Sequence, residues 1–200
     1  MMAARAEADL AARGGHGDRV RTREIDADRA VHEAALVRLL RLACSGELAA
    51  IRAYQGHWRS LGEGAERDRI RQIEAEELRH RGNVLAMLER MGRRPAAVRE
   101  RVMGCIGSLL GAFCHVTGWL APMYGAAILE TKNVKEYDDA AEHARRSGWH
   151  ELVAGLVEMA DVELEHELYF KAKVLSHPVG RLLPLPACTR AAVPAIAREP

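Results

Sequence analysis

The chain has 200 residues, of which 48% are hydrophobic and 28% are charged, and these proportions are ordinary for one soluble domain with a sizeable core. Its formal net charge of +1 excludes the basic surplus that sequence-independent nucleic-acid binding requires, so we expect no nucleic-acid partner. The four cysteines are scattered without a C-x-x-C pair, which favours buried thiols in a reducing compartment and predicts a cytoplasmic protein.

The first predicted element is a flexible N-terminal tail at residues 1–24, rich in Ala, Arg and Gly. The tail contains acidic residues and lacks an apolar h-region, which argues against a secretory signal. From residue 25 to 177 the sequence predicts helix almost throughout, because prolines are few and no β-type alternation occurs. Glycine or proline marks the expected helix breaks, at 62–64, 92–95, Pro122, 147–148 and Pro178. The predicted fold class is therefore all-α.

Four long helical stretches carry polar side chains at positions where the apolar stripe predicts a buried residue. Apolar residues three and four apart mark the buried face of a helix, and this spacing places a glutamate or an E-x-x-H motif on each inward face. In chain order the pattern is one Glu, one E-x-x-H, a second Glu and a second E-x-x-H. The residues concerned are Glu47, Glu77, His80, Glu130, Glu163 and His166.

This pattern predicts a metal centre. Buried charges cost several kcal/mol each unless they are compensated, and two divalent cations would balance the four carboxylates. Each motif alone is common by chance, but their combination is the ligand set of carboxylate-bridged di-iron and di-manganese four-helix bundles. Oxygen and nitrogen ligands without thiolates suit iron or manganese better than zinc or copper. We therefore expect two Fe ions, with Mn as the less favoured metal.

Two tyrosines repeat at the same distance from the two single glutamates. Tyr54 follows Glu47 by seven residues and Tyr137 follows Glu130 by seven, which is about two helical turns in each case. Both tyrosines are therefore candidate catalytic residues beside a bound substrate, with ordinary core packing as the alternative. Asp161, two residues before Glu163, is a candidate hydrogen-bond acceptor for a ligand histidine.

The segment at 102–129 contains no Asp, Glu, Lys or Arg and is long enough to span a bilayer. Its five glycines, Pro122 and its direct continuation into Glu130 favour an element that docks at the membrane interface. Burial in the core and a true membrane span remain as alternatives. An apolar entrance beside the metal centre would suit an apolar substrate. Residues 178–200 form a Pro-rich C-terminal tail that we expect to fold back or to stay mobile.

Several motifs together resemble the demethoxyubiquinone hydroxylase family over roughly residues 36–177. They are GELAAIRAYQGH (46–57), EELRH (76–80), GRRP (92–95), ILE (128–130), EYDDA (136–140) and DVELEH (161–166). The resemblance implies a ferritin-like di-iron monooxygenase that is peripheral on the inner face of the cell membrane. It implies hydroxylation of a polyprenyl benzoquinol ring, the conversion of demethoxyubiquinone to demethylubiquinone in ubiquinone biosynthesis.

By motif position, the same six residues would be the iron ligands, and Arg52, Tyr54 and Tyr137 also match family positions. The chain departs from the family at Glu136, where a histidine is usual, and in its shorter, proline-broken C-terminal region.

The expected partners are an apolar quinone, O2 and an external reductant. The reductant must be external because the chain has no Gly-rich nucleotide fold or rubredoxin-like cysteine cluster that could supply electrons. A homo-oligomer is left open. The alternatives are a ferritin-like ferroxidase or peroxide-reducing enzyme, and a non-catalytic scaffold that binds quinone or lipid. The apolar segment disfavours the ferroxidase, and the intact ligand set disfavours the scaffold.

Overall fold

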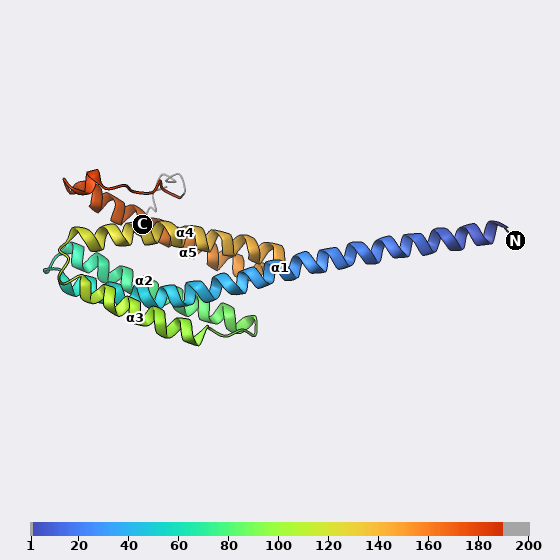
Figure 1. The fold of residues 1–200 in the computed structure, drawn as a ribbon, viewed down its shortest axis with the longest axis horizontal. Coiled ribbons are helices and arrows are strands. Elements are labelled where there is room, and N and C mark those ends of the chain that lie inside the picture. The colour runs from blue at the N-terminus through green and yellow to red at the C-terminus, as the bar shows by residue number, and fades with distance from the viewer. Residues whose placement is uncertain (1, 190–200) are drawn as a thin grey trace, which may run out of the picture.

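The structure is a computed structural model that describes the backbone of residues 2–189 and the side chains from Ile25 onward. This part of the chain is helical and contains no strand, which confirms the all-α class (Figure 1). Its elements are α1 (Met2–Ser60), α2 (Ala65–Arg90), α3 (Ala97–Phe113), α4 (Leu120–Ser147), α5 (His150–Ser176) and a short 3-10 helix η1 (Gly180–Leu182).

The helix ends largely follow the glycines. Gly92 after α2 and Gly148 after α4 have φ angles of 64° and 85°, a left-handed conformation that side chains with a Cβ adopt at a cost. The break predicted at Pro122 lies elsewhere, because the turn between α3 and α4 ends before Leu120. Pro122 instead occupies the first turn of α4, where its missing N–H costs no intrahelical hydrogen bond.

The N-terminal region differs from the tail predicted at residues 1–24. Helix α1 begins at Met2 and continues without interruption to Ser60, so the first predicted helix starts much earlier than expected. Figure 1 shows this stretch of α1 projecting beyond the other helices. The many Ala and Arg residues in the stretch have high helix propensity, which offsets its glycines.

Helices α1, α2, α4 and α5 form the bundle, and its apolar core has two parts. One part contains Leu36, Leu40, Val84, Leu88, Leu152 and Leu156. The other part contains Tyr54, Ile70, Ile73, Met123, Phe170 and Val174. Each of the four helices passes from one part to the other, and the predicted metal ligands lie between them along the chain. The polar residues therefore form a layer that is closed by apolar packing at both ends.

Helix α3 lies against α1 through a row of glycines. Gly104, Gly107 and Gly111 are buried, and a Cβ at Gly107 would lie 2.3 Å from the backbone oxygen of Ala49. The opposite face of α3 and the following turn expose large apolar side chains, with Leu109 at 60% and Val116 at 76% exposure. Complete burial of the apolar segment, one of the three readings, is therefore wrong. Among the described residues, no helix combines the length and the apolar character needed to cross a membrane.

The C-terminal segment folds back over α4 and α5 as far as the structure describes it. The Tyr124 hydroxyl donates to the Pro184 carbonyl at 2.8 Å, and Lys171 Nζ donates to the Pro186 carbonyl at 2.7 Å. The Thr189 hydroxyl donates to the Thr131 carbonyl at 3.1 Å. These contacts fit the folding-back alternative up to residue 189, and residues 190–200 of the predicted tail lie outside the described residues.

Candidate metal centre

The four bundle helices bring all six predicted ligands into two adjoining groups. In each group, one potential ligand atom from every residue lies within 4.8 Å of the others. The first group is Glu47, Glu77, His80 and Glu163. The second group is Glu77, Glu130, Glu163 and His166. Because Glu77 and Glu163 belong to both groups, each carboxylate can reach two neighbouring ions.

The centre is closed to solvent and contains polar atoms without partners. All six side chains are buried, and Glu77, Glu163 and His166 have no exposed surface. Both carboxylate oxygens of Glu77, one oxygen of Glu47 and Nδ1 of His166 form no hydrogen bond. Buried polar atoms are normally paired, so four orphaned atoms in one place need an explanation. Two divalent cations fit this donor set, since they would bind these atoms and balance the four carboxylates.

Electrostatic coupling divides the six residues by protonation state when no cation is present. Burial lowers the pKa of His80, but its hydrogen bond with Glu163 and the nearby Glu77 carboxylate outweigh this effect and raise the pKa to about 9. Burial is likewise outweighed at His166, where the nearby carboxylates of Glu163, Glu76 and Glu77 raise the pKa to about 12. Both histidines are therefore cationic near neutral pH in the metal-free protein.

The four glutamates fall into two pairs. Burial, followed by repulsion from neighbouring carboxylates, raises the pKa of Glu47 and of Glu130 well above the usual range. Burial acts in the same direction on Glu77 and Glu163, but neighbouring groups, with His80 and His166 among them, outweigh it and leave both pKa values lowered. Without cations the layer thus contains two neutral carboxyl groups, two carboxylates and two imidazolium groups, which sum to zero charge.

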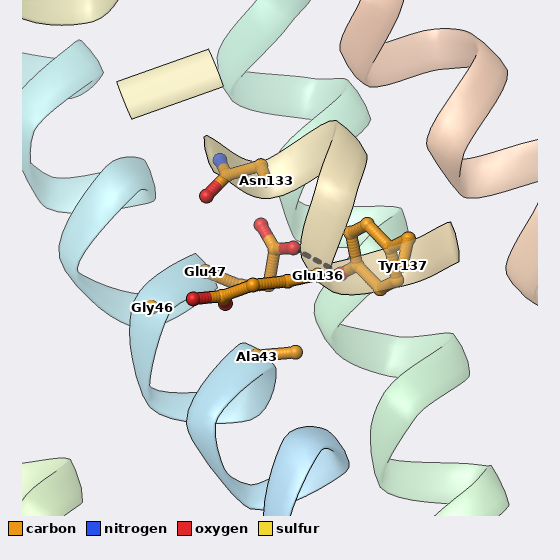
Figure 2. Close-up of a pocket in the computed structure, with 6 residues that line it drawn as sticks. All are labelled: Ala43, Gly46, Glu47, Asn133, Glu136 and Tyr137. Carbon is orange, nitrogen blue, oxygen red and sulfur yellow. Dashed lines mark hydrogen bonds between the residues drawn. The ribbon is translucent and has the colours of Figure 1, made fainter. Parts of the chain in front are cut away.

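The two tyrosines cross from one half of the site to the other. The Tyr54 hydroxyl on α1 donates to Glu130 on α4, and the Tyr137 hydroxyl on α4 donates to Glu47 on α1. Figure 2 shows the second of these bonds, with Asn133 and Glu136 beside it on α4. Burial and the adjacent carboxylate raise the pKa of each tyrosine well above its ordinary value, so both remain donors. Their role in catalysis stays a prediction.

Supporting contacts appear that sequence reasoning missed. Nε2 of His166 lies 2.7 Å from Glu76, which also accepts a hydrogen bond from Arg69 at 3.1 Å. Burial acts to raise the pKa of Glu76, but His166 and then Arg69 outweigh it and lower the pKa to about 2. The carboxylate that supports His166 is thus Glu76, while the role predicted for Asp161, which lies exposed, stays a prediction. A helix places neighbours about 100° apart, so Glu76 lies off the stripe that contains Glu77.

Three further residues, Asn133, Glu167 and Arg52, lie outside the two ligand groups. The Asn133 amide donates to Glu130 at 3.0 Å, although nothing in the stripe pattern singled it out. Glu167 belongs to neither ligand group, is fully buried and pairs with Lys171 at 2.5 Å. Arg52 belongs to neither ligand group, and its guanidinium donates to Ser108 on α3 at 3.3 Å.

A cavity of about 470 Å³ adjoins the centre between α1, α3 and α4. Its wall is mainly apolar, with Met103, Ile106 and Phe113 on the α3 side. Glu130 and Tyr54 also line it, so the cavity reaches the second ligand group. A separate hollow of about 20 Å³, lined by Glu47 and Tyr137 among others, adjoins the first group (Figure 2). The larger space has the size and character of a small-molecule site.

A family model described as "Ubiquinone biosynthesis protein COQ7" matches residues 34–179. This range contains α2 to α5, residues 34–60 of α1, all six ligand residues and both tyrosines. No curated protein and no solved structure matches the chain.

Proposed function

The chain belongs to the ubiquinone biosynthesis protein COQ7 family, and on this premise we propose that it is a di-iron monooxygenase that hydroxylates a polyprenyl benzoquinol ring. A role in ubiquinone biosynthesis follows from the family. The hydroxylation step, the identity of the metal and the roles of individual residues are the proposal. The observation that carries it is the pair of buried ligand groups that share Glu77 and Glu163.

The proposed cofactor is two iron ions held by the six ligand residues. Four carboxylates and two imidazoles match iron in donor chemistry, and two divalent ions bring the site to zero charge with both histidines neutral. The chemistry that a bound iron pair supplies is the binding and two-electron reduction of O2.

The surrounding side chains hold the ligands and exclude water. Tyr54 and Asn133 orient Glu130 through hydrogen bonds to its two oxygens. Tyr137 does the same for Glu47. The apolar layers above and below the centre keep bulk water out, which strengthens the electrostatic interactions inside it.

The proposed reaction converts a ring C–H bond into C–OH. One oxygen atom of O2 enters the product and the other leaves as water, with two electrons and two protons consumed. The electrons come from an external reductant. The cavity beside Glu130 supports an apolar ring with part of its prenyl tail as the substrate, because it is large, mainly apolar and continuous with the ligand group.

Isotope labelling tests this proposal. Ferrous-loaded protein, given labelled O2, a reductant and a demethoxyquinol with a short prenyl tail, should yield a product that contains one labelled oxygen by mass spectrometry. Glu130→Gln should lose this activity but still bind the quinone. Rapid iron oxidation without labelled quinol would favour the ferroxidase alternative, and quinone binding without either reaction would favour the scaffold.

Docking at the membrane interface is the second part of the proposal. It is supported by the exposed apolar face of α3, which borders the cavity where a membrane-dissolved substrate would enter. Leu109→Glu should weaken liposome flotation without lowering helical circular dichroism. Leu78→Glu on α2 is the matched control, because Leu78 is 61% exposed and Leu109 is 60% exposed. Equal flotation of both variants and the wild type would contradict docking through α3.

A further inference from the structure

Among the described residues that line the large cavity, His57 alone has a buried side-chain atom without a hydrogen-bond partner. The side chain is 2% exposed, and its Nε2 has no partner. Other polar groups of the wall are paired, since Tyr54 and Asn133 donate to Glu130 and Thr117 donates to the Phe113 carbonyl. A buried ring nitrogen without a partner is unfavourable, so His57 is expected to gain a partner when the cavity is filled.

The His57 ring is held in place by two aromatic neighbours. It lies nearly parallel to the rings of Tyr54 and Phe170, with interplanar angles of 22° and 20° and centroid distances of 6.5 and 6.4 Å. Tyr54 and Phe170 are themselves parallel within 4°. Tyr54 is also the residue that donates to Glu130, one helical turn from His57 on the same face of α1. The imidazole therefore lies next to Tyr54, the side chain that binds the ligand residue Glu130.

The imidazole is also neutral. Burial lowers the pKa of His57 to about 4, and the nearby Glu66 offsets only part of this effect. His57 belongs to neither ligand group, so its nitrogens are not committed to a metal. A neutral imidazole can donate to a carbonyl oxygen or accept from a hydroxyl group, depending on its tautomer. These are the two forms of oxygen on a quinone and a quinol.

We propose that His57 Nε2 forms a hydrogen bond with a ring oxygen of the quinone or quinol in the cavity and so orients the ring relative to the metal ligands. This inference rests on the proposed function, because it assumes that the cavity binds a quinone. It adds a ligand-binding residue that is separate from the six ligands and the two tyrosines.

Two small molecules that differ only in their ring oxygens isolate the contribution of this hydrogen bond. Affinities are measured for a short-prenyl benzoquinone and for the matching prenylbenzene, which has no ring oxygens, using ferric protein without reductant so that no turnover occurs. His57→Phe should weaken quinone binding about tenfold while prenylbenzene binding changes less than about twofold. His57→Gln, which can still donate and accept, should recover most of the quinone affinity. His150→Phe, at an exposed position on α5 outside the cavity wall, is the matched control.

The outcomes separate this inference from the proposed function. In one outcome, wild-type protein binds the quinone while His57→Phe weakens the binding of quinone and prenylbenzene equally, or of neither. The role of His57 is then overturned and the proposed function stands. If wild-type protein binds prenylbenzene as tightly as the quinone, the hydrogen bond is again excluded. If it binds no quinone, the proposed substrate class fails and the inference fails with it. His57→Leu replaces His57→Phe in the same comparison if circular dichroism shows that the Phe variant is misfolded.

Discussion

Loading the metal-free protein with two divalent ions near neutral pH should release about four protons per chain. Metal ligands must be deprotonated carboxylates and neutral imidazoles. Glu47 and Glu130 are protonated before binding, because burial and the neighbouring carboxylates raise their pKa values. His80 and His166 are also protonated, because their pKa values are about 9 and about 12. Each of these four residues gives up one proton, whereas Glu77 and Glu163 are already ionised.

The sign of the pH dependence follows from this count. Because binding releases protons, affinity should rise with pH, and the logarithm of the binding constant should change by about four per pH unit near neutrality. Isothermal titration calorimetry with ferrous iron under anaerobic conditions, in two buffers of different ionisation enthalpy, measures the number of protons released. Glu47→Gln should reduce the count by about one, since that side chain then has no carboxyl proton to lose.

A count of about two for the wild type would refute the reasoning. It would mean that Glu47 and Glu130 are already ionised in the metal-free protein and that only the histidines exchange protons. An unchanged count in Glu47→Gln would likewise show that this residue does not contribute its proton.

The other predictions concern single contacts. The pKa of His57 is about 4 against 6.5 in the unfolded chain, so the unfolded chain takes up a proton first and the free energy of unfolding should fall by about 3 kcal/mol as pH drops from 6.5 to 4. Urea unfolding across this range should show the loss in the wild type and a flatter profile in His57→Gln. Gly107→Val should cost about 3 kcal/mol or more, because α3 would be forced away from α1, whereas Gly82→Ala, with open space at its Cβ, should stabilise by up to about 1 kcal/mol in the same assay. Glu76→Gln should lower metal affinity about 10-fold to 100-fold by equilibrium dialysis, because it weakens the support of His166.

The ligand residues could be predicted because their spacing is a property of single helices. Glu77 and His80 share a face at i, i+3, and so do Glu163 and His166, whatever the helices pack against. The burial of each face follows from the apolar residues around it. A four-helix bundle buries all four of these faces at once and brings their ligand residues together.

The apolar segment was harder to interpret because composition alone does not separate its two faces. Gly104, Gly107 and Gly111 are spaced by three and four residues, and this spacing places them on one side of α3. That signal was present in the sequence and predicts close packing through the glycine face with the larger side chains left outside. The helical start of α1 was missed because the stretch lacks an apolar stripe, although its Ala and Arg content favours a helix.

Contacts between helices could not be predicted, because they depend on how each helix is rotated about its axis. Tyr54 is close in sequence to Glu47 yet bonds to Glu130, and Tyr137 is close to Glu130 yet bonds to Glu47. This crossing joins α1 to α4 at two points, so a rotation of either helix would disturb both single glutamates at once. The two glutamates with raised pKa values are the two that accept these bonds. Since a protonated carboxyl group still offers a lone pair to the tyrosine hydroxyl, the same bond persists before and after proton release. The crossed tyrosines can therefore hold Glu47 and Glu130 in position throughout metal uptake.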